Sequence, residues 1–152
     1  MADLACGCPG TQVRTLKNIE QNDNTSSERL VSELRQWPTQ LQLVPPTAPY
    51  LDHAHLLIAA DCVPFAYAEF HRDFIKGRVL VNACPKLDDS SSYIDKLTDI
   101  IARNAIQSVT VTIMEVPCCR GLAMFAEQAI AKSGRDVPLN VVIIGVDGQR
   151  RN

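Results

Sequence analysis

The sequence of 152 residues lacks the features of nucleic-acid-binding, membrane-spanning and secreted proteins. Its 15 Lys and Arg nearly balance its 17 Asp and Glu, for a net charge of −2, which argues against a basic surface for nucleic acid or anionic lipid. No apolar run approaches the ~20 residues that span a bilayer. The first residues, MADLACGC, lack the basic and apolar regions of a signal peptide. We therefore expect a cytoplasmic protein.

The chain also lacks the glycine-rich motifs with which many α/β domains bind phosphate groups. Only seven glycines are present, and neither GxGxxG nor GxxxxGK[ST] follows any apolar run. The sequence therefore gives no support for a dinucleotide site or a P-loop.

Cysteine, by contrast, is plentiful, with six in the chain. A chain of this length buries roughly two-thirds of its unfolded surface in one core, so it needs no disulfide for stability. In a reducing compartment, clustered cysteines are more often metal ligands or catalytic residues than disulfides. The cysteines therefore indicate metal or redox chemistry.

The pattern of apolar and polar segments predicts a cysteine-bearing N-terminal arm and loop over residues 1–26 and a single domain over residues 27–152. The polar stretch NIEQNDNTSS lacks any apolar period. A short helix is expected from residue 26 or 27 to Pro38, which stops it. The alternation of polar and apolar residues over 40–44 predicts a half-buried edge strand.

Three repeats of strand and helix follow, and a final strand closes the domain. Short connections between them imply right-handed βαβ crossovers and a mostly parallel sheet covered on both faces. The predicted fold is an α/β, Rossmann-like three-layer sandwich with about five strands. The final strand has an unbroken apolar core and is expected to be buried on both faces. The expected strands are His55–Ala60, Arg78–Ala83, Ser108–Val116 and Pro138–Val146, and the expected helices are Pro64–Ile75, Ser90–Asn104 and Gly121–Ser133.

Cys62, Cys84 and the pair Cys118 and Cys119 each follow the end of a predicted strand. The carboxyl ends of parallel strands share one edge, and ligands of such sheets bind there. Neighbouring strands are about 4.8 Å apart, so thiolates from three strand ends can surround an object several ångströms across. Each turn also opens a helix, whose N-terminus favours the thiolate. Cys8 is expected to cover the same edge from the N-terminal arm.

Soft thiolate ligands select zinc, Cu(I) or iron–sulfur clusters. Structural zinc sites usually draw ligands from close pairs of the CxxC type, whereas a [4Fe-4S] cluster takes one ligand per corner and suits scattered cysteines. We therefore favour a [4Fe-4S] cluster bound by Cys8, Cys62, Cys84 and one of Cys118 and Cys119, with zinc as the alternative. Burial of the thiols as small apolar side chains is the minor option. The role of Cys6 stays open.

Two further residues adjoin the expected ligands. Asp61 directly precedes Cys62, and Lys86 lies two residues after Cys84. Either side chain can hydrogen-bond sulfur, set the charge of a cluster or donate a proton to a bound substrate. His53 and His55 lie at the opposite end of their strand from the cysteines, which makes them poor co-ligands.

Several segments that join a cysteine to unusual neighbours carry a resemblance to a known family. The chain resembles a poorly characterised family of iron–sulfur proteins from anaerobic bacteria and archaea, in which longer members carry a two-cluster ferredoxin module before a domain like this one. The resemblance implies a cysteine-bound cluster in a Rossmann-like domain but no reaction. This chain departs from the longer members because it lacks the CxxCxxCxxxCP run of a ferredoxin. The segments are CPGTQVRTL (8–16), RQWPTQLQLVPPTAPY (35–50), LLIAADCVPFAY (56–67), FHRDF (70–74), GRVLVNACPKLDD (77–89) and EVPCCRGL (115–122).

Three functions are compatible with these observations. The first is an electron-transfer protein with one [4Fe-4S] cluster, which exchanges electrons with a separate redox partner such as a ferredoxin. The second is a redox enzyme that uses an open cluster iron or a spare thiol, since five or six cysteines exceed the four that a closed cubane needs. The third is a zinc-stabilised binding module without turnover. The sequence does not decide whether the protein is an enzyme.

Overall fold

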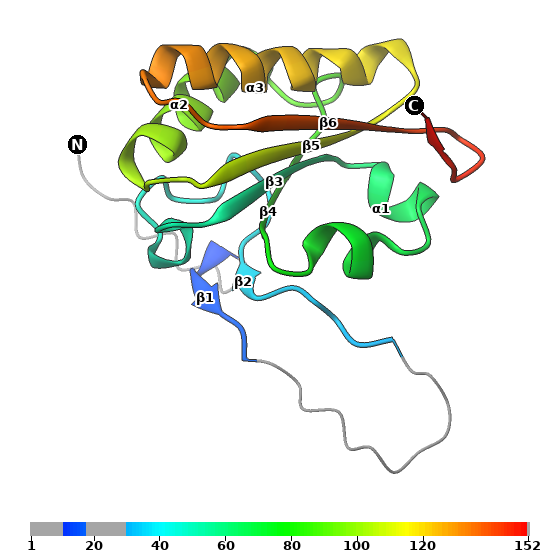
Figure 1. The fold of residues 1–152 in the computed structure, drawn as a ribbon, viewed down its shortest axis with the longest axis horizontal. Helices are drawn as coiled ribbons and strands as arrows, with labels where there is room; N and C mark the ends of the chain where they lie inside the picture. The colour runs from blue at the N-terminus through cyan, green and yellow to red at the C-terminus, as the bar shows by residue number, and fades with distance from the viewer. Residues whose placement is uncertain (1–10, 18–29, 152) are drawn as a thin grey trace.

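The computed structural model describes residues 11–17 and 30–151, and its largest element is a five-stranded sheet in the order β4-β3-β5-β6-β7 (Figure 1). β3, β4, β5 and β6 run parallel, and the short β7 pairs antiparallel with the end of β6. The predicted α/β fold with a mostly parallel sheet is therefore confirmed. The strands are β3 (His55–Ala60), β4 (Val79–Ala83), β5 (Ser108–Met114), β6 (Leu139–Ile144) and β7 (Arg150–Arg151).

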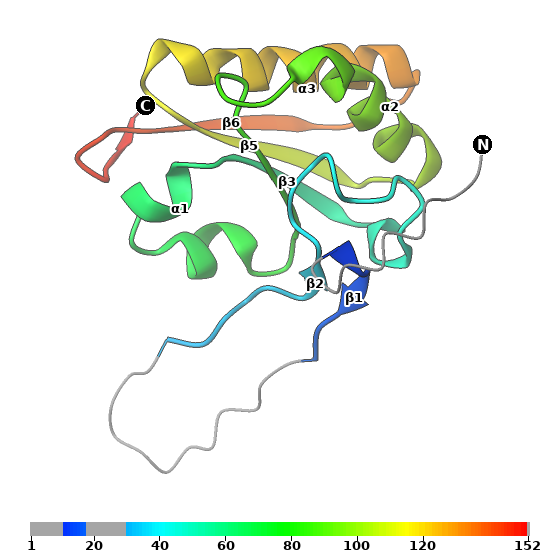
Figure 2. The same ribbon diagram turned by 180° about the vertical axis from the view of Figure 1, so that it is seen from behind.

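Helices cover both faces of this sheet. The two long helices α2 and α3 lie side by side on one face, and the short α1 and η3 lie on the other (Figures 1 and 2). Within the described residues, no helix is long and apolar enough to cross a membrane. The helices are η2 (Pro49–Leu51), α1 (Val63–Ala66), the π-helical turn η3 (His71–Ile75), η4 (Ser90–Ser92), α2 (Tyr93–Arg103), η5 (Pro117–Cys119) and α3 (Arg120–Ser133).

The periodicity of the sequence explains how these layers pack. In β3 every residue after His55 is buried, as expected for a central strand that is covered on both faces. In α2 the buried residues Leu97, Ile100 and Ile101 recur with the spacing of one helix face. Burying each of these side chains stabilises the fold by about 1.5–3 kcal/mol. The helix face and the sheet therefore form one continuous core.

The strand order places a topological switch point beside β3. From β3 the chain crosses to β4 on one side, and from β4 it returns over the opposite face to β5 on the other side. The two crossovers therefore leave the carboxyl edge of the sheet in opposite directions. In open α/β sheets this point on the carboxyl edge is where ligands bind.

The N-terminal part of the domain differs from the prediction. Residues 30–35 form no helix, and the short β2 (Gln36–Trp37) pairs antiparallel with β1 (Arg14–Thr15). The predicted helix is therefore wrong over its described residues. The extended backbone allows the buried Gln36 to donate from Nε2 to the carbonyl oxygen of Leu80 at 2.6 Å, on the edge strand β4.

The predicted edge strand over residues 40–44 is also wrong. Only Gln40 forms a bridge, to Asn82 of β4, and a turn follows it. Leu41 and Val44 are both fully buried whereas Leu43 is 45% exposed. Leu41 and Val44 are three residues apart. A turn places two such side chains on the same side of the backbone, whereas an extended strand points them to opposite faces.

Two other elements are shorter or more exposed than predicted. The expected helix over residues 64–75 is broken, because Tyr67 leaves the helical conformation after α1 and a separate π-helical turn follows at His71. In β6, Asn140 and Val141 are exposed. The prediction of burial on both faces is therefore wrong. β7 pairs with Ile143 and Ile144, and the first half of β6 has no strand partner on that side among the described residues.

Candidate metal centre

Four cysteines lie together at the carboxyl ends of three adjacent strands. Cys62 stands between β3 and α1, Cys84 directly follows β4, and Cys118 and Cys119 lie in η5 between β5 and α3. The last residue of β3 pairs in register with the last residue of β4, so these two strands end level. All four cysteines line one pocket of about 180 Å³. An apolar cavity of about 150 Å³ accommodates benzene, so this pocket has room for a compact ligand.

The four thiols differ in exposure. Cys62 and Cys118 are exposed and Cys84 is partly buried, whereas Cys119 is only 8% exposed. Burial raises the pKa of the Cys119 thiol, a backbone hydrogen bond at Met114 opposes this, and the neighbouring Cys118 and Cys62 raise the pKa again. Cys119 is therefore the least accessible of the four thiols.

The thiols border a space and do not converge on one point. Within residues 11–17 and 30–151, no three His, Cys, Asp or Glu side chains are grouped closely enough to hold a single metal ion. A zinc ion holds each thiolate sulfur at about 2.3 Å and therefore needs such a tight group. A cubane cluster needs its ligands further apart, one at each corner. Among the described residues, the four cysteines therefore line the pocket without forming a site for a single metal ion.

A partly buried carboxylate, that of Asp88, holds the turn that carries Cys84. The Oδ2 atom of Asp88 accepts a hydrogen bond from the backbone N–H of Cys84 at 3.0 Å and a short one from the hydroxyl of Tyr93. Tyr93 is 1% exposed, and burial together with Asp88 raises the pKa of its phenol. Because Tyr93 is the first residue of α2, these hydrogen bonds link the Cys84 turn to that helix.

Asp61 and Lys86 occupy different surroundings. Asp61 lines the pocket, and its Oδ1 atom accepts a hydrogen bond from Nδ2 of Asn82 at 2.7 Å. This contact links the end of β3 to β4 beside Cys62. Lys86 is exposed and is not among the residues that line the pocket. The structure therefore brings Asp61, but not Lys86, to the cysteines.

The C-terminal hairpin closes one side of the pocket. Val146 lines the pocket, and its backbone N–H donates to Oε1 of Glu115 at 3.1 Å. The other carboxylate oxygen of Glu115 bonds Nε of Arg151 at 3.0 Å. These contacts lower the pKa of Glu115. A carboxylate after β5 thus holds the hairpin against the carboxyl edge.

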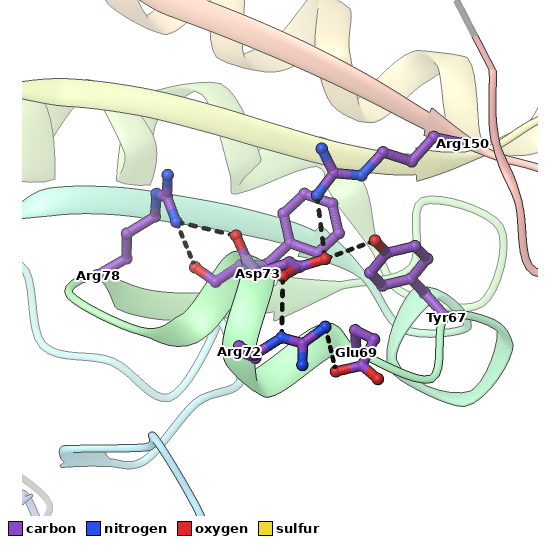
Figure 3. A network of polar contacts seen from close by, with 7 residues as sticks. Tyr67, Glu69, Arg72, Asp73, Arg78 and Arg150 are labelled. Atoms are coloured by element: carbon purple, nitrogen blue, oxygen red, sulfur yellow. Dashed lines mark hydrogen bonds and ion pairs between the residues drawn. The ribbon is translucent and has the colours of Figure 1, made fainter.

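A second set of contacts ties the same hairpin to α1 and η3 (Figure 3). The guanidinium of Arg150 lies 4.7 Å from the ring centre of Phe74 and 5.4 Å from that of Tyr67. Asp73 accepts from the Tyr67 hydroxyl at 2.6 Å and pairs with Arg150 at 3.5 Å. At the hairpin tip, Gly148 has a φ of +82°, a conformation that favours glycine.

Comparisons with known proteins agree with this architecture. A sequence model of the family described as "Rossmann-like domain" matches residues 48–151. The chain belongs to the Rossmann-like domain family. The matched segment includes the four cysteines of the pocket and excludes Cys6 and Cys8.

One protein that is similar to this chain comes from an archaeon. The protein, from Archaeoglobus fulgidus, is described as "Uncharacterized protein" and is 31% identical over 118 residues, which cover 78% of this chain and 83% of the relative. No solved structure matches this chain. The comparisons therefore establish the family without assigning an activity or a cofactor to it.

The predicted site of this Rossmann-like protein is assembled only in part within the described residues. Cys62, Cys84, Cys118 and Cys119 meet at one pocket, whereas Cys8, like Cys6, lies outside the described residues. Sequence reasoning missed the hairpin that carries Val146, although the Asp-Gly dipeptide at its tip is a known hairpin signal. The hydrogen bond from the backbone N–H of Cys84 to the Asp88 carboxylate is a second contact that the sequence analysis did not predict.

Proposed function

We propose that this protein binds one iron–sulfur cluster, of the [4Fe-4S] type, and passes single electrons to and from a partner protein. The observation that carries the proposal is the meeting of four cysteines from three strand ends at one pocket. Segments as distant in sequence as Cys62 and Cys119 supply thiols to the same small volume. Iron–sulfur clusters are held by cysteine thiolates, one at each corner of a [4Fe-4S] cluster, so thiols that border one pocket from several strand ends support the proposal.

The residues of the pocket suit such a cofactor. Cys62, Cys84 and one of the pair Cys118 and Cys119 would bind three of its corners. When bound, the cluster supplies reversible one-electron chemistry. The rest of the lining is mostly apolar, with Met114, Val116 and Val146 among it, and apolar surroundings limit solvent access and so tune a reduction potential.

Cys8 is the proposed fourth ligand, and its reach can be estimated from the described chain. Thr15 lies beside the first residues of β3 and β4, at the edge opposite the cysteines. The six residues of β3 correspond to about 20 Å between the two edges. Seven residues lead from position 15 back to position 8, and they span at most ~25 Å when extended. The proposal therefore requires the segment before Thr15 to run extended toward the carboxyl edge.

Asp61 and Lys86 are proposed to act on the cluster indirectly. Asp61 holds the Cys62 turn through its hydrogen bond to Asn82, and its charge beside the pocket would oppose the addition of an electron. Lys86 is exposed two residues from Cys84, and a flexible ammonium there would favour the reduced state. Replacing each by its neutral analogue, Asp61→Asn and Lys86→Gln, should therefore shift the reduction potential in opposite directions.

Serine substitutions provide the test of the ligand set. Protein reconstituted without oxygen, with iron and sulfide, should show the visible absorbance of a cluster. Cys62→Ser and Cys84→Ser should lose most of this absorbance, because each removes the only thiol at its strand end. Met124→Ser is a matched control, since it removes an exposed sulfur of α3 that does not line the pocket.

Two outcomes would contradict the proposal. One is stoichiometric binding of zinc without sulfide by the anaerobic protein, which would favour a zinc-stabilised binding module. The other is an unchanged cluster content in both Cys62→Ser and Cys84→Ser. Circular dichroism of each variant establishes that a lost cluster reflects a lost ligand rather than a lost fold.

A redox enzyme is the second candidate because the pocket offers a surplus thiol. Together with Cys8, the four lining cysteines give one more thiol than a closed cubane needs. Alkylation of the cluster-loaded protein distinguishes the candidates. A thiol that reacts without loss of the cluster, and whose alkylation leaves electron transfer to a dye unchanged, is free for substrate chemistry.

A further inference from the structure

A second pocket lies at the amino edge of the sheet, opposite the cysteines. It has a volume of about 300 Å³. His55 and Val79, the first residues of β3 and β4, line it, together with Gln36 of β2 and Tyr50 of η2. The six-residue length of β3 puts about 20 Å between this pocket and the cysteines. The two pockets are therefore separate sites.

The permanently charged groups that line this pocket are the guanidiniums of Arg35 and Arg78. Its lining includes Arg35, Arg78, His53 and His55, and none of the described residues that line it is Asp or Glu. The Arg35 guanidinium already donates hydrogen bonds to the carboxylate of Glu33 and to the backbone carbonyl oxygens of Ser32 and Leu34.

Arg78 is the other guanidinium that lines the pocket, and it pairs with no carboxylate among the described residues. Its Nη1 atom donates to the backbone carbonyl oxygens of Asp73 and Phe74 at 3.3 and 2.9 Å. The Asp73 carboxylate turns instead to Tyr67, Arg72 and Arg150 (Figure 3). Among the described residues, Arg78 therefore forms no ion pair, and a guanidinium in this state suits a phosphate or carboxylate.

Two buried oxygen atoms of the lining lack hydrogen-bond partners. Gln36 is 1% exposed, and while its Nε2 atom donates to Leu80, its Oε1 atom has no donor within the described residues. The hydroxyl oxygen of Tyr50 is likewise buried and unpaired there. Buried polar atoms in folded proteins are rarely left without a partner. Neither oxygen is accessible from the pocket in this conformation, so a ligand hydroxyl pairs with it only when the side chain rotates toward the pocket.

We propose that the amino-edge pocket binds a small anionic polyol, a sugar phosphate or a sugar acid. Arg78 binds the phosphate or carboxylate, Gln36 accepts a hydrogen bond from a hydroxyl, and Tyr50 bonds a second hydroxyl. The volume of about 300 Å³ is twice that of a cavity that holds benzene, which fits a ligand of this class. This site is independent of the proposed cluster.

Nuclear magnetic resonance of the histidine rings tests the proposal with an internal control. The chain has three histidines, of which His53 and His55 line the pocket and His71 does not. The probes are ribose 5-phosphate and gluconate, with ribose and inorganic phosphate as partial ligands, all at constant pH and ionic strength. We expect the signals of His53 and His55 to shift with a dissociation constant of about 1 mM or less, while that of His71 stays in place.

The four probes separate the contributions to binding. Ribose lacks the anion and phosphate lacks the polyol, so each should bind at least about tenfold more weakly than the complete ligand. The tighter of ribose 5-phosphate and gluconate identifies the anionic group. No saturable shift with either anionic polyol would overturn the proposal, as would equal affinity for ribose or for phosphate alone.

Two substitutions connect the affinity to the named residues. Arg78→Gln should weaken binding about 10- to 100-fold, the value of a charge-assisted hydrogen bond, whereas Arg72→Gln, outside the pocket, should not. Because Arg78 also bonds the last turn of η3, Tyr50→Phe serves as the second variant. It removes an unpaired hydroxyl, so the unfolding midpoint should hold or rise while binding weakens about 5- to 10-fold. Wild-type affinity in both Arg78→Gln and Tyr50→Phe would contradict the assignment.

Discussion

The contact between Asp88 and Tyr93 offers a quantitative test of how the fold holds the Cys84 turn. Asp88 accepts from the backbone N–H of Cys84 and from the Tyr93 hydroxyl. A hydrogen bond to a charged group contributes about 1.5–3 kcal/mol. Tyr93→Phe removes one such bond and keeps the packing of the ring, so it should lower the free energy of unfolding by about that amount.

Asp88→Ala should cost more, because it removes both bonds and leaves the Tyr93 hydroxyl buried without an acceptor. The two bonds together contribute about 3–6 kcal/mol. In the Asp88→Ala background the Tyr93 hydroxyl has already lost its acceptor. Adding Tyr93→Phe to that background should therefore not lower the free energy of unfolding further. The coupling free energy of the double-mutant cycle should therefore be about 1.5–3 kcal/mol.

Urea unfolding of the reduced, metal-free protein measures these free energies. Asp89→Ala is the matched control, because the carboxylate of Asp89 bonds Ser91 and not Tyr93. It should cost about 0.5–2 kcal/mol as the loss of a helix cap and should be additive with Tyr93→Phe. A coupling below about 0.5 kcal/mol for Asp88 and Tyr93, the usual limit for independent sites, would refute the assigned contact.

Three further predictions concern the hairpin, the cysteine pair and pH. Arg150→Ala should lower the free energy of unfolding by about 1–2 kcal/mol, because it removes the contacts of Arg150 with two aromatic rings and with the Asp73 carboxylate. It should also speed amide exchange over residues 145–151. Unchanged exchange there would contradict the idea that these contacts hold the hairpin. Of Cys118→Ser and Cys119→Ser, one should retain the cluster, because adjacent side chains diverge; loss in both would mean joint ligation. The pKa of the Tyr93 phenol is raised above 10 in the folded state, so the folded state binds this proton more tightly than the unfolded state does. The resulting stabilisation is lost as pH rises above 10. The wild type should therefore lose stability above pH 10 more steeply than Tyr93→Phe, and parallel pH profiles of the two proteins would contradict this prediction.

The repeated strand and helix units were predictable because their signals are local and consistent. Each of β3, β4 and β5 is a short apolar run followed by a proline within four residues, and β4 and β5 are then followed by the long helices α2 and α3. Parallel pairing then brings the strand ends to one edge, whatever the order of the strands. This is why Cys62, Cys84, Cys118 and Cys119 could be placed together from the sequence.

The segment before β3 was not predictable because tertiary contacts determine it. Leu30, Val31 and Leu34 have the spacing of a helix face, yet Leu30 is 75% exposed and the backbone is irregular. The deciding contact is the hydrogen bond from the Gln36 side chain to β4, 44 residues away in sequence. Local propensity carries no information about such a pair.

Side-chain contacts around the site were predictable only in part. The sequence shows that an acid, Asp61, directly precedes Cys62. It does not show that the Asp61 carboxylate accepts a hydrogen bond from Asn82. The ion pair of Glu115 with Arg151 depends on a hairpin that returns the chain end to β6. The amino-edge pocket could not be foreseen, because it joins segments near residues 15, 36, 50 and 78 that no motif connects.

The most direct test of the central claim is the iron and sulfide content of protein purified without oxygen. The account predicts close to four iron atoms and four sulfides per chain, as one [4Fe-4S] cluster requires, and loss of both in the Cys62→Ser variant. Folded anaerobic protein that contains neither iron nor sulfide, before and after reconstitution, would contradict it.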